Sequence, residues 1–173
     1  MLIEHPGHKP VVPDSAYVAP SATLCGAAVL GEGTRVLHGA VQTSEDGEVR
    51  VGENTVVMEH ALVRGRFAHP ALIGDAVMIG PHAHVNGAVL RDEVFIATGA
   101  SLFPGAVVEA GGEVRINAPP ERHEGIWAVQ RELDFPGTVY GVDRGTSMRE
   151  IMAAQSEFYG SHRQDTVLGH EGM

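Results

Sequence analysis

The sequence predicts an all-β solenoid, in which short parallel strands wind into a stack of triangular coils. Three observations point to it: aliphatic side chains recur every six residues, a small residue stands four positions after most of them, and 22 glycines accompany only 5% aromatic residues. An amphipathic helix would repeat its apolar positions every three or four residues, so it does not fit this period. A six-residue period is typical of β-helical solenoids, with about eighteen residues in each coil.

The aliphatic repeat keeps its phase over most of the chain. Its members are Val12, Val18, Leu24, Leu30, Val36, Val51, Val57, Val63, Ile73, Ile79, Val85, Leu90, Ile96, Leu102, Val108 and Val114. The small residues that follow are Ala16, Ala22, Ala28, Thr34, Ala40, Thr55, Ala61, Ala83, Ala100, Ala106, Gly112 and Ala118. Each side of a triangular coil points one aliphatic residue inward, and only a small side chain fits beside it near the corner. We therefore expect these two sets to form the core, with residues such as Gly31 and Asn54 turning the corners.

The repeat breaks at three places, which predict departures from a regular coil. Extra polar, proline or glycine residues at 43–50 and 65–72 predict two loops, and one residue is missing between Val85 and Leu90. Loops inserted into a solenoid usually gather on one face, which is often the face that binds a ligand.

The six-residue repeat ends at two consecutive prolines, and the sequence after them has a different pattern. We divide it there into a β-helix over residues 1–118 and a C-terminal extension over 119–173. In the extension, Ser147 followed three residues later by Glu150 forms a capping box. The apolar residues at helical spacing are Met148, Ile151, Met152, Phe158 and Tyr159. This pattern predicts an α-helix over about 147–159 that packs on the outside of the solenoid.

Charge and composition exclude several classes of partner. Twelve Lys and Arg against 22 Asp and Glu give a net charge of −10, which repels nucleic acid and anionic membrane surfaces. Cys25 is the only cysteine, so the chain has no internal disulfide. The N-terminus lacks the basic start and apolar stretch of an export signal, so we expect a cytoplasmic protein.

The repeat resembles that of the gamma-class carbonic anhydrases and their relatives, above all in Val51–Thr55 and Ile73–Gly80. The resemblance implies a left-handed parallel β-helix, an exception to the usual right-handed crossover. It also implies a homotrimer with sites between subunits, and a zinc ion held by three histidines. When the hexapeptide repeats of the family and of this chain are aligned in phase, the three histidine positions hold Arg64, Pro81 and Asn86 in this chain.

None of these three residues is a zinc ligand of the expected kind, because arginine has no lone pair to give, proline has no donor side chain and an amide is a weak ligand. The first interpretation is therefore a homotrimeric binding or structural protein that has lost the three-histidine zinc site. Arg64 beside Asn86 suits a small anionic ligand in the subunit cleft. The alternative, which the 22 acidic residues favour, is a salt bridge from Arg64 to Glu59, Glu45 or an acidic residue of a neighbouring subunit. Together with Glu59 and with His82 as a general base, Arg64 and Asn86 are the candidate catalytic residues.

A second interpretation is a hydratase or hydrolase with a displaced metal site. The repeat shifts by 22 residues between neighbouring coils, so His60 is expected to stack on His82, with His84 two residues further along. Adjacent rungs lie ~4.8 Å apart, at which distance His60 and His82 could share zinc or another divalent metal. The third ligand would come from His84, from Glu59 or from a neighbouring subunit. The alternative is that these histidines are ordinary outward-facing polar residues.

A third interpretation is an acyltransferase, because many such enzymes share the hexapeptide period. A histidine in the subunit cleft would serve as the base. The chain shows only short insertions and an early end to its repeat, whereas binding the arm of coenzyme A calls for a long loop and a shaped last coil. We rank this interpretation behind the other two.

Overall fold

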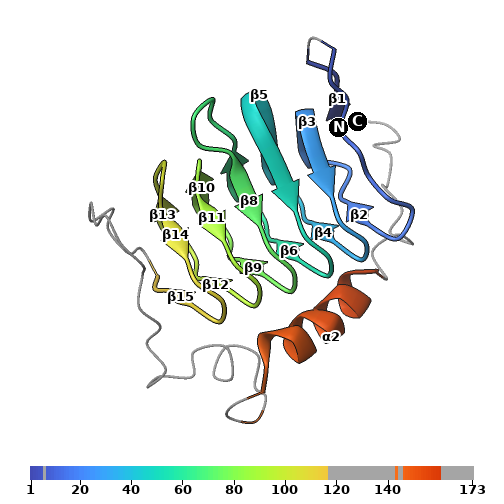
Figure 1. Ribbon diagram of the computed structural model, residues 1–173. Coiled ribbons are helices and arrows are strands. Elements are labelled where there is room, and N and C mark those ends of the chain that lie inside the picture. The colour runs from blue at the N-terminus through green and yellow to red at the C-terminus, as the bar shows by residue number, and fades with distance from the viewer. Residues whose placement is uncertain (6, 117–142, 144–145, 161–173) are drawn as a thin grey trace, which may run out of the picture.

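The computed structural model describes residues 1–5, 7–116, 143 and 146–160 of the 173-residue chain. These residues wind into a left-handed parallel β-helix with one α-helix on its outside, which confirms the predicted fold class. Figure 1 shows the strands succeeding one another along one axis, with the helix beside them. The predicted boundary between residues 118 and 119 lies outside the described residues.

The elements are short, as expected for sides of a small triangle. They are β1 (Leu2–Ile3), β2 (Tyr17–Val18), β3 (Thr23–Leu30), β4 (Arg35–Val36), β5 (Val41–Val51), β6 (Val56–Val57), β7 (Leu62–Arg64), β8 (Ala71–Ile73), β9 (Met78–Ile79), β10 (His84–Asn86), β11 (Val89–Leu90), β12 (Phe95–Ile96), β13 (Ser101–Leu102), β14 (Val107–Val108), β15 (Glu113–Val114) and α2 (Met148–Gly160).

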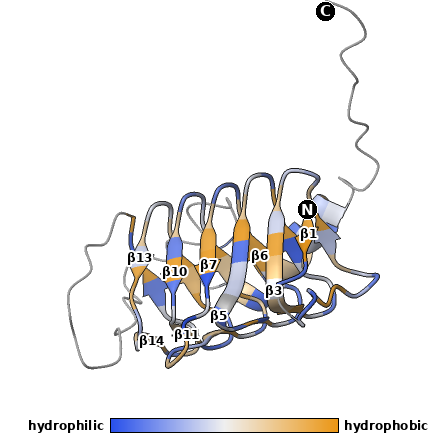
Figure 2. Cartoon of the chain, turned by 90° about the horizontal axis from the view of Figure 1, so that it is seen from above, coloured by the Kyte–Doolittle hydropathy of each residue, from blue (hydrophilic) through white to orange (hydrophobic). Residues whose placement is uncertain are grey.

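The strands form two parallel sheets. One runs in the order β15-β12-β9-β6-β4-β2 along one side of the triangle. The other follows β13-β10-β7-β5-β8-β11-β14 and covers two sides, because the long strand β5 belongs to both. Figure 2 shows the rungs in succession, seen from above. The register between β7 and β10 pairs Val63 with Val85, which confirms the predicted shift of 22 residues.

The predicted repeat forms the core. Every aliphatic member from Leu24 to Val114 is buried, and Val12 and Val18 of the first coil pack against this core with part of their surface exposed. Most of the small residues at the corners are buried as well, including Thr55, whose hydroxyl donates to the Gly74 carbonyl oxygen at 2.9 Å. Ala106 is partly exposed, and Ala118 lies outside the described residues. Small side chains at these positions let each coil close around the aliphatic stack.

Gln42 interrupts this core. It stands six residues after Val36, where the next aliphatic residue would fall, and it pairs with Leu24 and Val63 in the neighbouring rungs. It is 0% exposed, and neither its Oε1 nor its Nε2 atom has a hydrogen-bond partner. A buried polar atom without a partner costs about 1–3 kcal/mol, so this position opposes folding.

The first insertion is a bulge in a continuous strand, so the prediction of a loop over 43–50 is wrong. Strand β5 pairs with β3 on both sides of the insertion, Gly26 with Ser44 and Ala28 with Val49. The extra residues therefore lie opposite a single residue of β3. Gly26 has a φ of 74°, a left-handed backbone that glycine adopts at low cost, which allows β3 to turn this corner.

The second insertion lies against the first at the same corner. Arg66 and His69 exchange backbone hydrogen bonds of 2.9 and 3.0 Å, which close a tight turn. A Cβ atom added to Gly47 would stand 2.2 Å from the Arg66 carbonyl oxygen, so the two insertions are in close contact. The side chain of Arg66 also reaches Asp46, with 3.8 Å between Nη1 and Oδ2. The insertions thus gather at one corner of the triangle.

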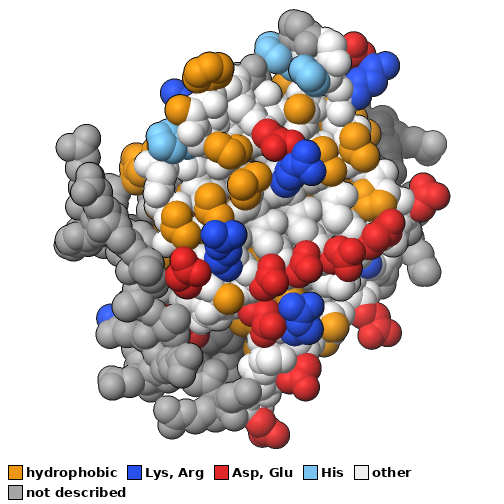
Figure 3. All heavy atoms as spheres, in the orientation of Figure 1, with side chains coloured by type: hydrophobic (Ala, Val, Ile, Leu, Met, Phe, Trp, Pro, Cys, Tyr) orange, Lys and Arg blue, Asp and Glu red, His pale blue; other side chains and the backbone are white. Residues whose placement is uncertain are grey.

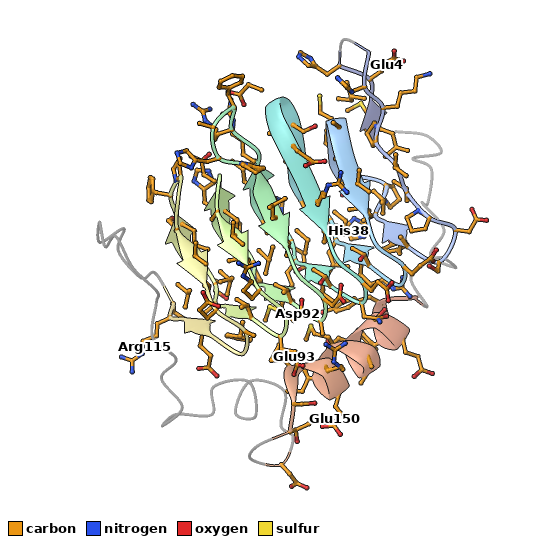
Figure 4. The ribbon with its side chains drawn as sticks, in the orientation of Figure 1. Glu4, His38, Asp92, Glu93, Arg115 and Glu150 are labelled. Carbon is orange, nitrogen blue, oxygen red and sulfur yellow. The ribbon has the colours of Figure 1, made fainter. Side chains whose placement is uncertain are left out.

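Helix α2 begins with the expected capping box. The Ser147 backbone N–H donates to the Glu150 carboxylate at 3.1 Å, and the Glu150 backbone N–H donates to Ser147 Oγ at 3.2 Å. Near the same end, Arg149 forms an ion pair of 3.3 Å with Glu93, which Figure 4 shows beside the helix. The buried residues Met148, Ile151, Met152 and Ser156 face the solenoid. Phe158 is 60% exposed and does not share this face, although its spacing predicted that it would.

Arg35 fastens the other end of α2 to the solenoid. This arginine of β4 is buried, its Nε donates to the Ser156 carbonyl oxygen at 2.7 Å, and its Nη1 donates to the Ser15 carbonyl oxygen at 2.6 Å. A cation near the C-terminus of a helix is stabilising, since the carbonyl groups there carry partial negative charge. Within the described ranges, no helix combines the length and apolar character needed to cross a lipid bilayer.

Replacing Gln42 with leucine should stabilise the protein. The change restores the aliphatic stack between Leu24 and Val63 and removes two unpaired amide atoms, so we expect the free energy of unfolding to rise by about 1–3 kcal/mol. Denaturant titration measures this free energy of unfolding. Thr55→Val is the matched control, because the Thr55 hydroxyl has partners, and this variant should lose stability. A Gln42→Leu protein that is less stable than the wild type would contradict the assignment.

Replacing Arg35 with methionine should loosen α2 while leaving the β-helix folded. Two charge-assisted hydrogen bonds are lost, and we expect local destabilisation of about 2–3 kcal/mol. Hydrogen exchange would then be faster at the amides of α2 than at those of the core strands. Arg149→Met serves as control, since exposed ion pairs contribute at most about 1 kcal/mol. Equal exchange in both variants would rule out the proposed role of Arg35.

Candidate functional site

The candidate site lies on the outward face of three neighbouring strands, β5, β7 and β10. The backbone register pairs Thr43 with Arg64 and Arg64 with Asn86, so these three outward residues form one column across the rungs. A second column beside it pairs His84 with Leu62 on one side and with Ser101 on the other. The backbone of a parallel ladder holds successive rungs at fixed spacing, so the register fixes which residues of this face are neighbours.

Arg64 and burial together keep His84 neutral. The pKa of His84 lies below its ordinary value of 6.5, first because burial disfavours the charged imidazolium and second because the Arg64 guanidinium is nearby. At neutral pH, the face therefore carries a guanidinium beside an uncharged imidazole. This combination attracts an anion and repels a cation.

Several buried polar atoms on these strands have no hydrogen-bond partner. Among the described residues, they include Thr43 Oγ1, His84 Nε2 and Asn86 Oδ1, as well as both amide atoms of Gln42 on the inner side of β5. Atoms of this kind are uncommon in folded proteins and call for an explanation such as a ligand or an ordered water. Their presence on neighbouring strands singles out this part of the solenoid as a candidate binding site.

The residues present at the expected zinc positions do not fit zinc. Arg64 and Asn86 lie side by side in the register, and the guanidinium would repel a divalent cation placed between them. Pro81 contributes only backbone, whose carbonyl oxygen accepts a hydrogen bond from Gly99 at 2.9 Å. In the part of the chain that the structure describes, no group of three or more His, Cys, Asp or Glu side chains is arranged to hold a metal ion.

His60 and His82 stack as the repeat predicts. Their ring centroids are 5.1 Å apart and their planes differ by 11°. Both residues turn the same corner with left-handed backbone, at φ values of 58° and 56°. The lone pairs of stacked imidazoles lie in parallel planes and do not converge on one point between the rings. His84 lies on β10 and is not part of the stack, so a metal shared by the three would need rearranged rings or a ligand from another chain.

The structure places Glu59 beside α2. The pKa of Tyr159 is raised, first by burial and second by the negative charge of Glu59, so the two groups interact electrostatically. Sequence patterns did not reveal this neighbour, because contacts between a helix and a distant corner leave no periodic signal. The other catalytic candidates divide into two places: Arg64 and Asn86 share a column, whereas His82 stacks at the adjoining corner.

The acidic side chains lie largely elsewhere. Figure 3 shows a row of them across the face turned to the viewer. At one corner, Asp75 Oδ1 accepts the Glu53 backbone N–H at 2.8 Å, and Asp92 Oδ1 accepts the Asp75 backbone N–H at 2.9 Å. These carboxylates therefore have a structural part, since they satisfy backbone donors where the chain turns.

Comparisons with known proteins point to one family, although no family model matches the chain. The mitochondrial gamma carbonic anhydrase 1 of Arabidopsis thaliana is 38% identical over 156 residues, which cover 86% of this chain and 54% of that protein. A carbonic anhydrase of Geobacillus kaustophilus is 22% identical over 111 residues, or 64% of this chain and 61% of that one. The chain thus spans about half the length of its plant relative.

Solved structures support the same fold. A Bacillus cereus protein described as an acetyltransferase candidate aligns with a TM-score of 0.70, at 19% identity, over 94% of this chain and 96% of that one. A likeness at this identity concerns the fold alone. Taken together with the repeat, the coil geometry and the plant relative, it leads to one conclusion: the chain belongs to the gamma-carbonic-anhydrase-like family of hexapeptide-repeat proteins.

Proposed function

We propose that the chain is a homotrimeric binding protein of this family that works without the three-histidine zinc site and takes a small anion at Arg64. The observation that carries the proposal is the column in which Arg64 and Asn86 occupy the positions expected for zinc ligands. A guanidinium offers planar, charged N–H donors that match a carboxylate or a similar anion. The uncharged imidazole of His84 near Arg64 is also compatible with a bound anion.

The assembly is proposed on the resemblance and on exposed aromatic surface. Phe67 at the tip of the second insertion is 92% exposed, and Phe103 near β10 is 45% exposed. Large exposed aromatic side chains are typical of contact surfaces between proteins. In a trimer, such residues would line the cleft that holds the anion. We also propose that the protein is located in the cytoplasm.

A second candidate function is metal-dependent hydration or hydrolysis around the His60–His82 stack. The observation in its favour is the 5.1 Å between the two rings, which is close enough for both to reach one ion after a rotation of the side chains. The acyltransferase alternative has no comparable support, because the likeness to an acetyltransferase candidate extends only to the fold.

The proposal predicts that restoring three histidines creates a zinc site. Protein purified without a histidine tag should contain no stoichiometric zinc, whereas the triple variant Arg64→His, Pro81→His, Asn86→His should bind about one zinc per subunit. Elemental analysis after dialysis measures the zinc content of both proteins. A triple variant with leucine at the same positions is the control. One zinc per subunit in the wild-type protein would refute the proposed loss of the site.

A second prediction concerns the charge of His84. Its ring should titrate below 6.5, and Arg64→Gln should raise its pKa part of the way, because burial remains. Since the unfolded chain binds this proton more readily, the contribution of His84 to stability is complete above 6.5 and is lost as the pH falls through its lower folded value. NMR of the histidine rings follows the titration. Arg66→Gln is the control, and an equal shift in it would speak against the assigned role of Arg64.

A further inference from the structure

The unpartnered atoms around Arg64 restrict which anions suit this face. Asn86 Oδ1 can only accept a hydrogen bond, Thr43 Oγ1 can donate or accept, and His84 Nε2 does either according to the tautomer. A plain carboxylate only accepts hydrogen bonds. It can therefore bind the guanidinium, but it leaves Asn86 Oδ1 unsatisfied.

The charge of the face argues for a single negative charge on the ligand. Burial and Arg64 keep His84 uncharged, so this imidazole adds no cation at neutral pH. The neighbouring arginines are engaged elsewhere, Arg50 with Glu48 at 2.6 Å and Arg66 with Asp46 at 3.8 Å. A phosphate carries about 1.5 to 2 negative charges at neutral pH and is usually held by several cations, so a pure monoanion matches this face better.

The donor that Asn86 requires should be uncharged. An ammonium group would stand beside the Arg64 guanidinium, and two like charges at short distance in a partly buried site repel each other. A hydroxyl group donates one hydrogen bond, carries no charge and can accept another from Thr43 or His84. Two further neighbours are apolar: Leu62 stands beside His84 in the ladder, and the Phe103 ring lies 6.5 Å from the imidazole. Ser101, which pairs with His84 on its other side, adds a hydroxyl group.

We propose that the face formed by Thr43, Arg64, His84 and Asn86 binds a small hydroxycarboxylate, a ligand class that rests on the anion-binding function proposed above. The carboxylate pairs with the guanidinium, and the hydroxyl group donates to Asn86 Oδ1. A guanidinium has five N–H donors, so Arg64 can hold the ligand and a protein neighbour at the same time. The three unpartnered atoms are closed to water in the single chain, so the ligand reaches them only when a neighbouring side chain moves aside.

The test compares glycolate, acetate and inorganic phosphate as probes, each titrated into the full-length protein and followed by calorimetry and by NMR of the His84 ring. One added hydrogen bond corresponds to about a five- to tenfold difference in affinity. Glycolate should bind that much more tightly than acetate, and phosphate no more tightly than acetate. Glycine, which has an ammonium group in place of the hydroxyl, should bind more weakly than glycolate.

Variants separate the two parts of the site. Asn86→Leu should remove the preference for glycolate and keep acetate binding, whereas Arg64→Gln should remove binding of both. Arg50→Gln is the matched control, since this arginine of β5 is paired with Glu48, and it should behave as the wild type. If Asn86→Leu does not fold, Thr43→Val replaces it, and the preference for glycolate should then be reduced.

The outcomes distinguish the inference from the proposed function. Equal binding of glycolate and acetate by the wild-type protein, or tighter binding of phosphate, would overturn the hydroxycarboxylate and leave anion binding in place. The absence of binding for every probe, or binding that survives Arg64→Gln, would overturn the anion site itself. Circular dichroism and molecular mass of each variant establish that the fold and the assembly are intact.

Discussion

The whole molecule depends on a single packing constraint, the stacking of aliphatic side chains inside a coil whose corners accept only small residues. Val57, Ile79 and Ile96 lie one above another on successive rungs, each fully buried. Because the backbone hydrogen bonds run from rung to rung, this stack fixes the register of every outward residue as well. The positions of Arg64, Asn86 and the stacked histidines follow from it.

The sequence was sufficient to predict the coil and its register, because a period of six leaves a signal in every rung. The shift of 22 residues correctly places Arg64 beside Asn86 and His60 beside His82. Features that depend on single contacts were not predictable in this way. The electrostatic interaction of Glu59 with Tyr159 is one example, because the tyrosine lies on a helix a hundred residues further along the chain.

Other departures from the regular coil differ in how clearly the sequence signals them. Gln42 stands in phase with the aliphatic residues, so its burial could have been anticipated from its position alone. The bulge in β5 was harder to foresee, because a polar insertion looks the same in sequence whether it leaves the sheet or stays in it. The spacing predicts that Phe158 shares the buried face of α2, but its side chain is 60% exposed, whereas the adjacent Tyr159 packs against the core.

Side chains alternate between the inside and the outside of the coil along β7 and β10. Residues that pack the core and residues of the candidate site therefore stand next to each other in the chain. Val63 and Val85 point inward and hold the coils together, whereas Arg64 and Asn86 point outward and take no part in that packing. Mutations at the outward positions can therefore accumulate during evolution while the scaffold stays intact. An ancestral metal enzyme and a descendant with unrelated chemistry can in this way share nearly superimposable backbones, and overall likeness is a poor guide to the reaction.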